Sequence, residues 1–293
     1  MSGPANRQVS GDFLATMAAS SRARSGAAQT ALPARELKAR IADLPAAPGL
    51  RLGGFDLIAE VKLRSPAVGL LKAAAEEDVG ARVASYAHAG AAAVSILTEP
   101  SRFDGSLDDL VAGARALQPL AVPAMRKDFL VDAYQVLEGR LAGASGVLAI
   151  LRMLPRADLE QLIDAALELN MFVLLEAFDA TDIELAHVLV DARRAQRRLL
   201  LVGVNSRDLA TLQVVPGRLD ALAASLPSEV KRVAESGVAT PADAARAAAS
   251  GYDLALVGSA LMSAPQPAVL ARAMLAEARA AVTARASMVG ARA

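Results

Sequence analysis

The sequence contains no cysteine, and only two of its 293 residues are histidines. Without cysteine there can be no disulfide bond, no thiolate metal site and no cysteine nucleophile. The absence is also compatible with a reducing cytoplasm, which is where we expect the protein to work. Two histidines are too few for a metal site built from several imidazoles. We therefore expect neither a bound metal nor any other cofactor.

Tryptophan is also absent, aromatic residues make up only 3% of the chain, and neither sign of charge is in excess, with 31 Lys+Arg against 31 Asp+Glu. Few aromatics disfavour stacking on nucleic-acid bases. A balanced charge gives no reason to expect nucleic acid or an anionic membrane as a partner. No apolar run approaches the ~20 residues of a membrane-spanning helix, and no targeting signal is evident. A small molecule is the expected partner.

Hydrophobic residues make up 54% of the chain, and from about residue 56 short runs of Val, Ile and Leu alternate with longer amphipathic segments. Near-continuous apolar runs are typical of parallel strands buried on both faces. Eight such units of about 25–30 residues predict an α/β fold, a (β/α)8 TIM barrel. An open doubly wound sheet, the alternative, usually has fewer strands and a glycine-rich first turn. The predicted strands are 57–63, 92–98, 121–127, 146–151, 172–177, 199–205, 231–236 and 254–258.

The first 55 residues stand outside this repeat. Segments 11–26 and 32–45 have helical spacing, and a loop with Pro and Gly leads into the first strand. We expect residues 1–55 to form a helical extension packed on a barrel of residues 56–293, the whole being a single domain.

Ionisable side chains occur within the apolar strands, and each lies near the carboxyl end of its strand. In a barrel these ends converge on one mouth, where active sites lie. Glu60 and Lys62 are two residues apart and share a face of the first strand. Burying such charges separately would cost several kcal/mol for each unpaired ion, so one shared polar pocket is the simpler explanation. The residues expected in it are Glu60, Lys62, Ser65, Lys127, Glu176, Asn205, Arg207, Glu235 and Ser236.

Glycines follow the last two predicted strands, in the segments SGV and GSALM. Glycine lets the backbone approach a ligand closely, and the free N–H groups at the start of a helix attract an anion. The pattern therefore predicts phosphate binding at Gly237, Gly258 and Ser259, and hence a small phosphorylated substrate.

Seven motifs, in order between about residues 57 and 262, resemble those of the indole-3-glycerol phosphate synthase family of tryptophan biosynthesis. The helical N-terminal extension also fits this family. The matching motifs are LIAEVKLRSP, AGAAAVSILTEPSRFDGSLDDL, PAMRKDFLVDAYQ, LLEAF, GVNSRDLATLQV, AESGV and ALVGSALM.

The resemblance implies a carboxy-lyase. It would close the ring of 1-(o-carboxyphenylamino)-1-deoxyribulose 5-phosphate to give indole-3-glycerol phosphate, releasing carbon dioxide and water. Lys127 would be the general acid at the ketone oxygen. Lys62 would bind or orient the substrate's carboxylate or phosphate and could assist proton transfer. Glu60 and Glu176 would transfer protons during loss of water, in an order that the sequence leaves open. The implied substrate-binding residues are Ser65, Phe129, Asn205, Arg207, Glu235 and Ser236, with Phe129 as a wall for the anthranilate ring.

Other functions stay open at this stage. A paralogue of the same fold would keep these residues and act on a modified anthranilate-derived substrate; Ala67 departs from the family's usual SPS loop, and Ala149 from its usual LLI run. A phosphoribosylanthranilate isomerase would need a cysteine base, which is missing. A non-catalytic phosphate-binding barrel would have no reason to keep Lys127 with two pocket glutamates. We expect a monomer, with a weak homodimer as the alternative.

Overall fold

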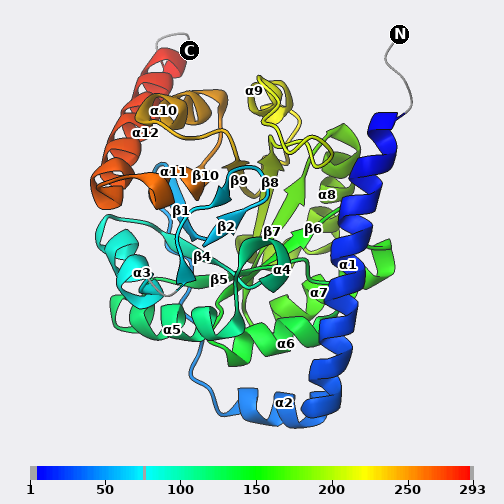
Figure 1. Ribbon diagram of the computed structural model, residues 1–293. Coiled ribbons are helices and arrows are strands. Elements are labelled where there is room, and N and C mark those ends of the chain that lie inside the picture. Colours follow the sequence, from blue (N-terminus) through cyan, green and yellow to red (C-terminus); the bar gives the residue numbers. More distant parts are fainter. Residues whose placement is uncertain (1–4, 75–76, 291–293) are drawn as a thin grey trace.

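The computed structural model describes residues 5–74 and 77–290 (Figure 1). Eight parallel strands close into a barrel in the order β1-β10-β9-β8-β7-β6-β5-β4, with helices outside them. The predicted TIM barrel is therefore confirmed, and each predicted strand overlaps an observed one. The strands are β1 (Asp56–Val61), β4 (Ala93–Leu97), β5 (Ala124–Lys127), β6 (Gly146–Ile150), β7 (Phe172–Ala177), β8 (Leu200–Asn205), β9 (Lys231–Glu235) and β10 (Leu254–Val257).

Side chains along each strand alternate between the inside of the barrel and the surrounding helices. Ile58, Met125 and Leu174 belong to the cluster that fills the barrel. Leu57 and Val173, one position away, pack instead in the layer beneath the helices. This alternation follows from the two-residue period of a strand. It decides which residues at the strand ends face the mouth.

Six helices begin at a side chain that accepts their first free N–H groups, which stabilises a helix start. Glu99 does so for α4. The other five capping residues are Asp78, Ser106, Asp132, Asp179 and Thr240. The helices are α1 (Ala5–Ala31), α2 (Ala34–Ala42), α3 (Val79–His88), α4 (Pro100–Phe103), α5 (Leu107–Leu117), α6 (Ala133–Leu141), α7 (Arg156–Glu168), α8 (Ala180–Ala192), α9 (Arg218–Ala223), α10 (Pro241–Ser250), α11 (Ser259–Ser263) and α12 (Pro267–Gly290). Short 3-10 helices, Gln118–Leu120 and Arg194–Leu199, precede β5 and β8.

The loop after β1 contains a short antiparallel hairpin that the sequence pattern did not predict. Its strands are β2 (Arg64–Ser65) and β3 (Gly69–Leu70). Each strand has only two residues, which is too short for an alternating pattern to be recognised. The hairpin carries Ser65, one of the predicted site residues, to the mouth of the barrel.

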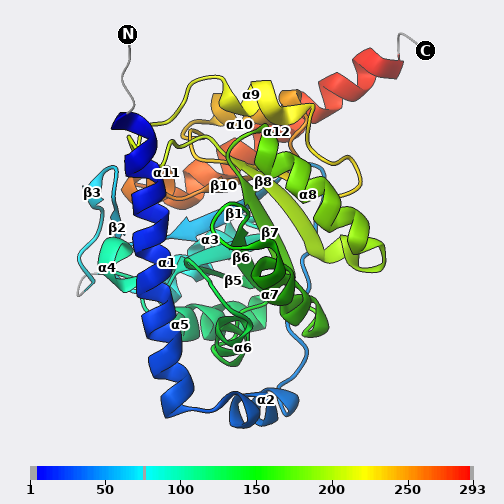
Figure 2. The same cartoon turned by 90° about the vertical axis from the view of Figure 1, so that its right-hand side faces the viewer.

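Helix α1 lies along the outside of the barrel, and α2 follows it at one end (Figures 1 and 2). Arg24 on α1 pairs with Asp128 at 2.8 Å, and the Tyr134 hydroxyl donates to the α1 carbonyl oxygen of Ala28 at 3.0 Å. The division of the chain at residue 55 stays a prediction. Within residues 5–74 and 77–290, no helix combines the length and apolar character that crossing a bilayer requires.

Candidate active site

A cavity of about 290 Å³ opens at the carboxyl ends of the barrel strands. All of the residues predicted for the pocket line it, although the chain distance between the first and the last is nearly 200 residues. Alternation within the strands explains four of these positions: Glu60, Lys127, Glu176 and Glu235 each follow an inward-facing apolar residue by two positions. The inward-facing polar residues at the strand ends are Glu60 on β1, Lys127 on β5, Glu176 on β7, Asn205 on β8 and Glu235 on β9.

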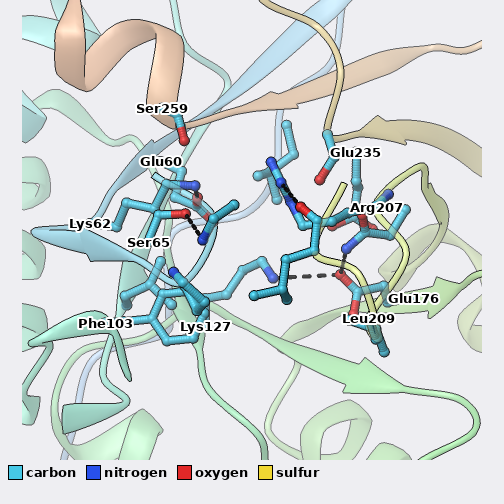
Figure 3. Close-up of a pocket in the computed structure, with 18 of the residues that line it drawn as sticks. Glu60, Lys62, Ser65, Phe103, Lys127, Glu176, Arg207, Leu209, Glu235 and Ser259 are labelled. Atoms are coloured by element: carbon cyan, nitrogen blue, oxygen red, sulfur yellow. Dashed lines mark hydrogen bonds and ion pairs between the residues drawn. The ribbon is translucent and has the colours of Figure 1, made fainter. Parts of the chain in front are cut away.

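Lys127 lies at the centre of the charged groups, and its Nζ is 3.6 Å from Glu176 Oε1 (Figure 3). Burial alone would lower the pKa of Lys127, but the carboxylates of Glu176, Glu60 and Glu235 raise it above its ordinary value. The ammonium is therefore protonated at neutral pH. Asn205 Nδ2 donates to the same Glu176 oxygen at 3.0 Å, which fixes the orientation of that carboxylate.

Glu60 and Lys62 form a close pair, with Lys62 Nζ 2.8 Å from Glu60 Oε1. Burial by itself would raise the pKa of Glu60, but the positive charges of Lys62, Lys127 and Arg207 lower it. Glu60 is therefore ionised. A Cβ at Gly258 on the neighbouring strand end would collide with Glu60 Oε1. A side chain at this position would therefore displace the ion pair, whatever a ligand requires.

Glu235 differs from the other two glutamates because no cation in the described part of the chain forms an ion pair with it. It is only 1% exposed, and neither carboxyl oxygen has a hydrogen-bond partner within the described residues. Burial raises the pKa of Glu235 well above its ordinary value, the nearby Glu176 carboxylate raises it further, and Lys127 offsets this only in part. A Cβ at Gly203 would collide with Glu235 Oε1, so the absent side chain leaves room for this carboxyl group.

Arg207 follows β8 and also lines the cavity. Its backbone N–H donates to Asn205 Oδ1 at 2.9 Å, and its guanidinium donates to the Leu212 carbonyl oxygen. Burial lowers the pKa of Arg207, although the negative charge of Glu60 opposes this. Asn205 therefore links Glu176 to the backbone of the next loop, so that both ends of its amide group have partners.

The glycine side of the cavity contains the predicted phosphate residues. Ser236 and Gly237 follow β9 with φ of 63° and 76°, a left-handed conformation that glycine adopts without steric cost. Ser259 begins α11 directly after Gly258. The polar side of the mouth is thus formed by β9, β10 and the hairpin that carries Ser65.

The opposite side of the cavity is apolar, and sequence reasoning missed most of it. Phe129 packs against Phe13 of α1, with ring centroids 5.9 Å apart, and against Phe103 of α4 at 6.2 Å. Phe103 lies inside one of the matching motifs, so a signal for it was present. Phe13 lies in a helix before the first strand, and no strand-end pattern could reveal it. The other apolar lining residues on this side are Leu14, Leu148, Ile150, Phe178 and Leu209.

The charged residues on either side of Lys127 form ion pairs of their own. Arg126, 3% exposed, donates to the Glu138 carboxylate at 2.7 Å and lies 3.4 Å from Asp128. Asp128 also accepts from Thr98 at 2.8 Å. Arg126 and Asp128 form a buried ion network behind the site. Among residues 5–74 and 77–290, no group of three or more His, Cys, Asp or Glu is placed to hold a metal ion.

Comparison with known proteins agrees with this geometry. The family model of indole-3-glycerol phosphate synthase matches residues 16–274. An indole-3-glycerol phosphate synthase from Nocardioides sp. is 41% identical over 243 residues, covering 82% of this chain and 88% of that protein. One from Mycobacterium leprae is 38% identical over 250 residues, covering 84% and 87%.

A multifunctional tryptophan biosynthesis protein of Schizosaccharomyces pombe is 39% identical over 218 residues, which are 74% of this chain and 27% of that protein. A solved structure described as native KDPGal has a TM-score of 0.56 at 21% identity, covering 80% of this chain and 98% of that one, and it supports the fold alone. The family match and the extent of the similarity show that the chain belongs to the indole-3-glycerol phosphate synthase family.

Proposed function

We propose that this pocket converts 1-(o-carboxyphenylamino)-1-deoxyribulose 5-phosphate into indole-3-glycerol phosphate, with release of carbon dioxide and water. The observation that carries the proposal is the buried ammonium of Lys127, 3.6 Å from Glu176, between an aromatic wall and a glycine-lined polar wall. The aryl ring of the substrate would lie against Phe129, and its phosphate would lie at Gly237 and Ser259. The ketone between these two groups then lies beside Lys127.

Ring closure begins when the aryl carbon bearing the carboxylate attacks the ketone carbon. A carbon–carbon bond forms, and the ketone oxygen takes the proton of Lys127. The buried ammonium also stabilises the negative charge that develops on this oxygen. The carboxylate then leaves as carbon dioxide, and the electron pair of the broken bond restores the aromatic ring.

Side chains of the same pocket also catalyse the loss of water. The new hydroxyl leaves with a proton from Lys62, while Glu176 removes a proton from the carbon next to the nitrogen, and the freed electron pair forms the indole double bond. Glu176 suits the role of base because Asn205 holds one of its oxygens at 3.0 Å. Glu60, bound to Lys62 at 2.8 Å, orients that ammonium. Arg207, Ser65 and Ser236 bind the substrate around these groups.

The test is to incubate the pure protein with the carboxyphenylamino-deoxyribulose phosphate and to follow the fluorescence of the indole product. Turnover in the wild type, absent in Lys127→Met, supports the proposal. Binding of the substrate without turnover would indicate a non-catalytic barrel. Turnover only of substrates with a modified ring would indicate the paralogue.

We also propose that the protein works as a monomer, because a single chain brings every residue predicted for the site into the cavity. Analytical ultracentrifugation at working concentration tests this, and a stable dimer would contradict it. A cytoplasmic location stays a prediction, to be tested by fractionation of cells that express the protein.

A further inference from the structure

Arg152, two residues beyond the end of β6, contacts the ring of Phe178 directly and its backbone through Asp182. Its guanidinium lies over the Phe178 ring, with Cζ 4.9 Å from the ring centroid. Its Nε donates to Asp182 Oδ2 at 2.8 Å, and its Nη2 donates to Asp179 Oδ2 at 2.5 Å. Asp182 Oδ2 also accepts the backbone N–H of Phe178 at 2.7 Å. One arginine and one carboxylate therefore hold both the ring and the backbone of Phe178.

Phe178 is part of the cavity wall. It follows Glu176 by two residues, lines the cavity and is only 3% exposed. It belongs to the same apolar cluster as Ile150 and Phe129, on the side of the mouth opposite the glycines. A cation over the face of an aromatic ring favours one orientation of that ring. The orientation of the Phe178 ring is therefore fixed, in the part of the cavity wall that would contact the aryl ring of the substrate.

We propose that Arg152 is a positioning residue which, through Phe178, determines the aryl rings that the site accepts. The proposal rests on the proposed function, because it assumes that an aryl ring occupies the apolar side. A fixed wall excludes a substituent on the ring edge that faces it, whereas a wall free to move would admit one. The alternative is a purely structural role, in which Arg152 only supports Asp179 at the start of α8.

The test compares Arg152→Gln and Phe178→Leu with a matched control, Arg193→Gln. Arg193 forms the same kind of ion pair with an aspartate of α7, its Nε lying 2.7 Å from Asp164 Oδ1. Arg193 does not line the cavity. Each variant is assayed with the unsubstituted substrate and with forms methylated at each free ring position in turn. Its circular dichroism spectrum and Tm are also recorded.

The wild type should discriminate against at least one methylated form by about 10-fold or more in kcat/KM, the usual effect of one methyl group in an apolar pocket. Arg152→Gln and Phe178→Leu should each reduce that discrimination about 10-fold, with KM for the unsubstituted substrate rising more than kcat falls. Arg193→Gln should lower Tm and leave the discrimination unchanged.

The proposal is overturned if Arg152→Gln lowers Tm as Arg193→Gln does but leaves the discrimination unchanged. It is also overturned if the wild type accepts every methylated form equally well. Should Arg152→Gln fail to fold, Phe178→Leu gives the same answer, because it keeps the ion pair. Binding of the substrate reduced at its ketone, which cannot cyclise, is measured by calorimetry with and without the ring methyl group. A wild type that binds these analogues selectively but turns nothing over would refute the proposed reaction and leave the selectivity proposal standing.

Discussion

Replacing Glu235 by glutamine should stabilise the protein while impairing its activity. The side chain is 1% exposed, no cation is bound to it, and neither of its oxygens has a hydrogen-bond partner within the described residues. Its negative charge would also face the carboxylate of Glu176. Glutamine has nearly the same shape, carries no charge, and can donate an N–H to Glu176. The substitution removes the cost of ionising a buried group and keeps the packing.

The magnitude depends on pH, and its sign follows from the direction of the pKa. Burial raises the pKa of Glu235 in the folded protein, whereas an unfolded glutamate has a pKa of about 4.3. As the pH rises above that value, the unfolded chain loses the proton first, so the stability of the wild type falls. The stability of the wild type stops falling once the pH exceeds the pKa of Glu235 in the folded protein. Glutamine has no proton to lose, so its advantage should grow with pH, to about 1–3 kcal/mol, the usual cost of an unsatisfied buried group.

Thermal unfolding of both proteins at about pH 5 and about pH 8 measures the effect, since each kcal/mol shifts Tm by about 2–4 °C in a protein of this size. Glu168→Gln, at an exposed position on α7, is the control and should show no growing difference. A difference that stays constant with pH, or a Glu235→Gln protein less stable than the wild type at the higher pH, would refute the reasoning. Glu235 would then be ionised and compensated. A gain in stability with a fall in kcat/KM would show a site that sacrifices stability for function.

Three further outcomes are expected. Lys127→Met should lower kcat by at least ~10³ with an unchanged circular dichroism spectrum; retention of more than about a tenth of kcat would make Lys127 a structural charge. Gly258→Val should lower kcat as well as raise KM, because its Cβ would collide with Glu60; a change in KM alone would limit Gly258 to phosphate binding. Activity should survive exhaustive treatment with EDTA, and a loss that a divalent ion restores would contradict this.

The barrel and the polar part of the site were predictable because both depend on short-range patterns. Buried parallel strands read as apolar runs, and a strand has a period of two residues. Glu60 and Glu176 could therefore be assigned to the inside of the mouth once the barrel was assumed. The β2–β3 hairpin was not predictable, because strands of two residues show no periodicity.

The partners of the charged groups could not be predicted, because pairing depends on distances between elements far apart in the chain. The sequence places Glu60, Glu176 and Glu235 in equivalent positions, two residues beyond an inward-facing apolar side chain. The structure separates them. Glu60 pairs with Lys62, Glu176 pairs with Lys127 and Asn205, and Glu235 pairs with no cation among the residues that the structure describes. These surroundings lower the pKa of Glu60 and raise the pKa of Glu235.

The three consecutive charges Arg126, Lys127 and Asp128 illustrate how packing gives neighbouring residues different roles. Alternation turns Lys127 into the cavity and Arg126 outward, which the period of a strand alone could have predicted, whereas Asp128 follows the end of β5. Their partners lie elsewhere: Asp128 accepts from Arg24 of α1, and Arg126 pairs with Glu138 of α6. The same α1 supplies Phe13 to the aromatic wall. The helix before the barrel therefore contributes to the site twice, through the buried ions behind Lys127 and through the surface expected to contact the aryl ring.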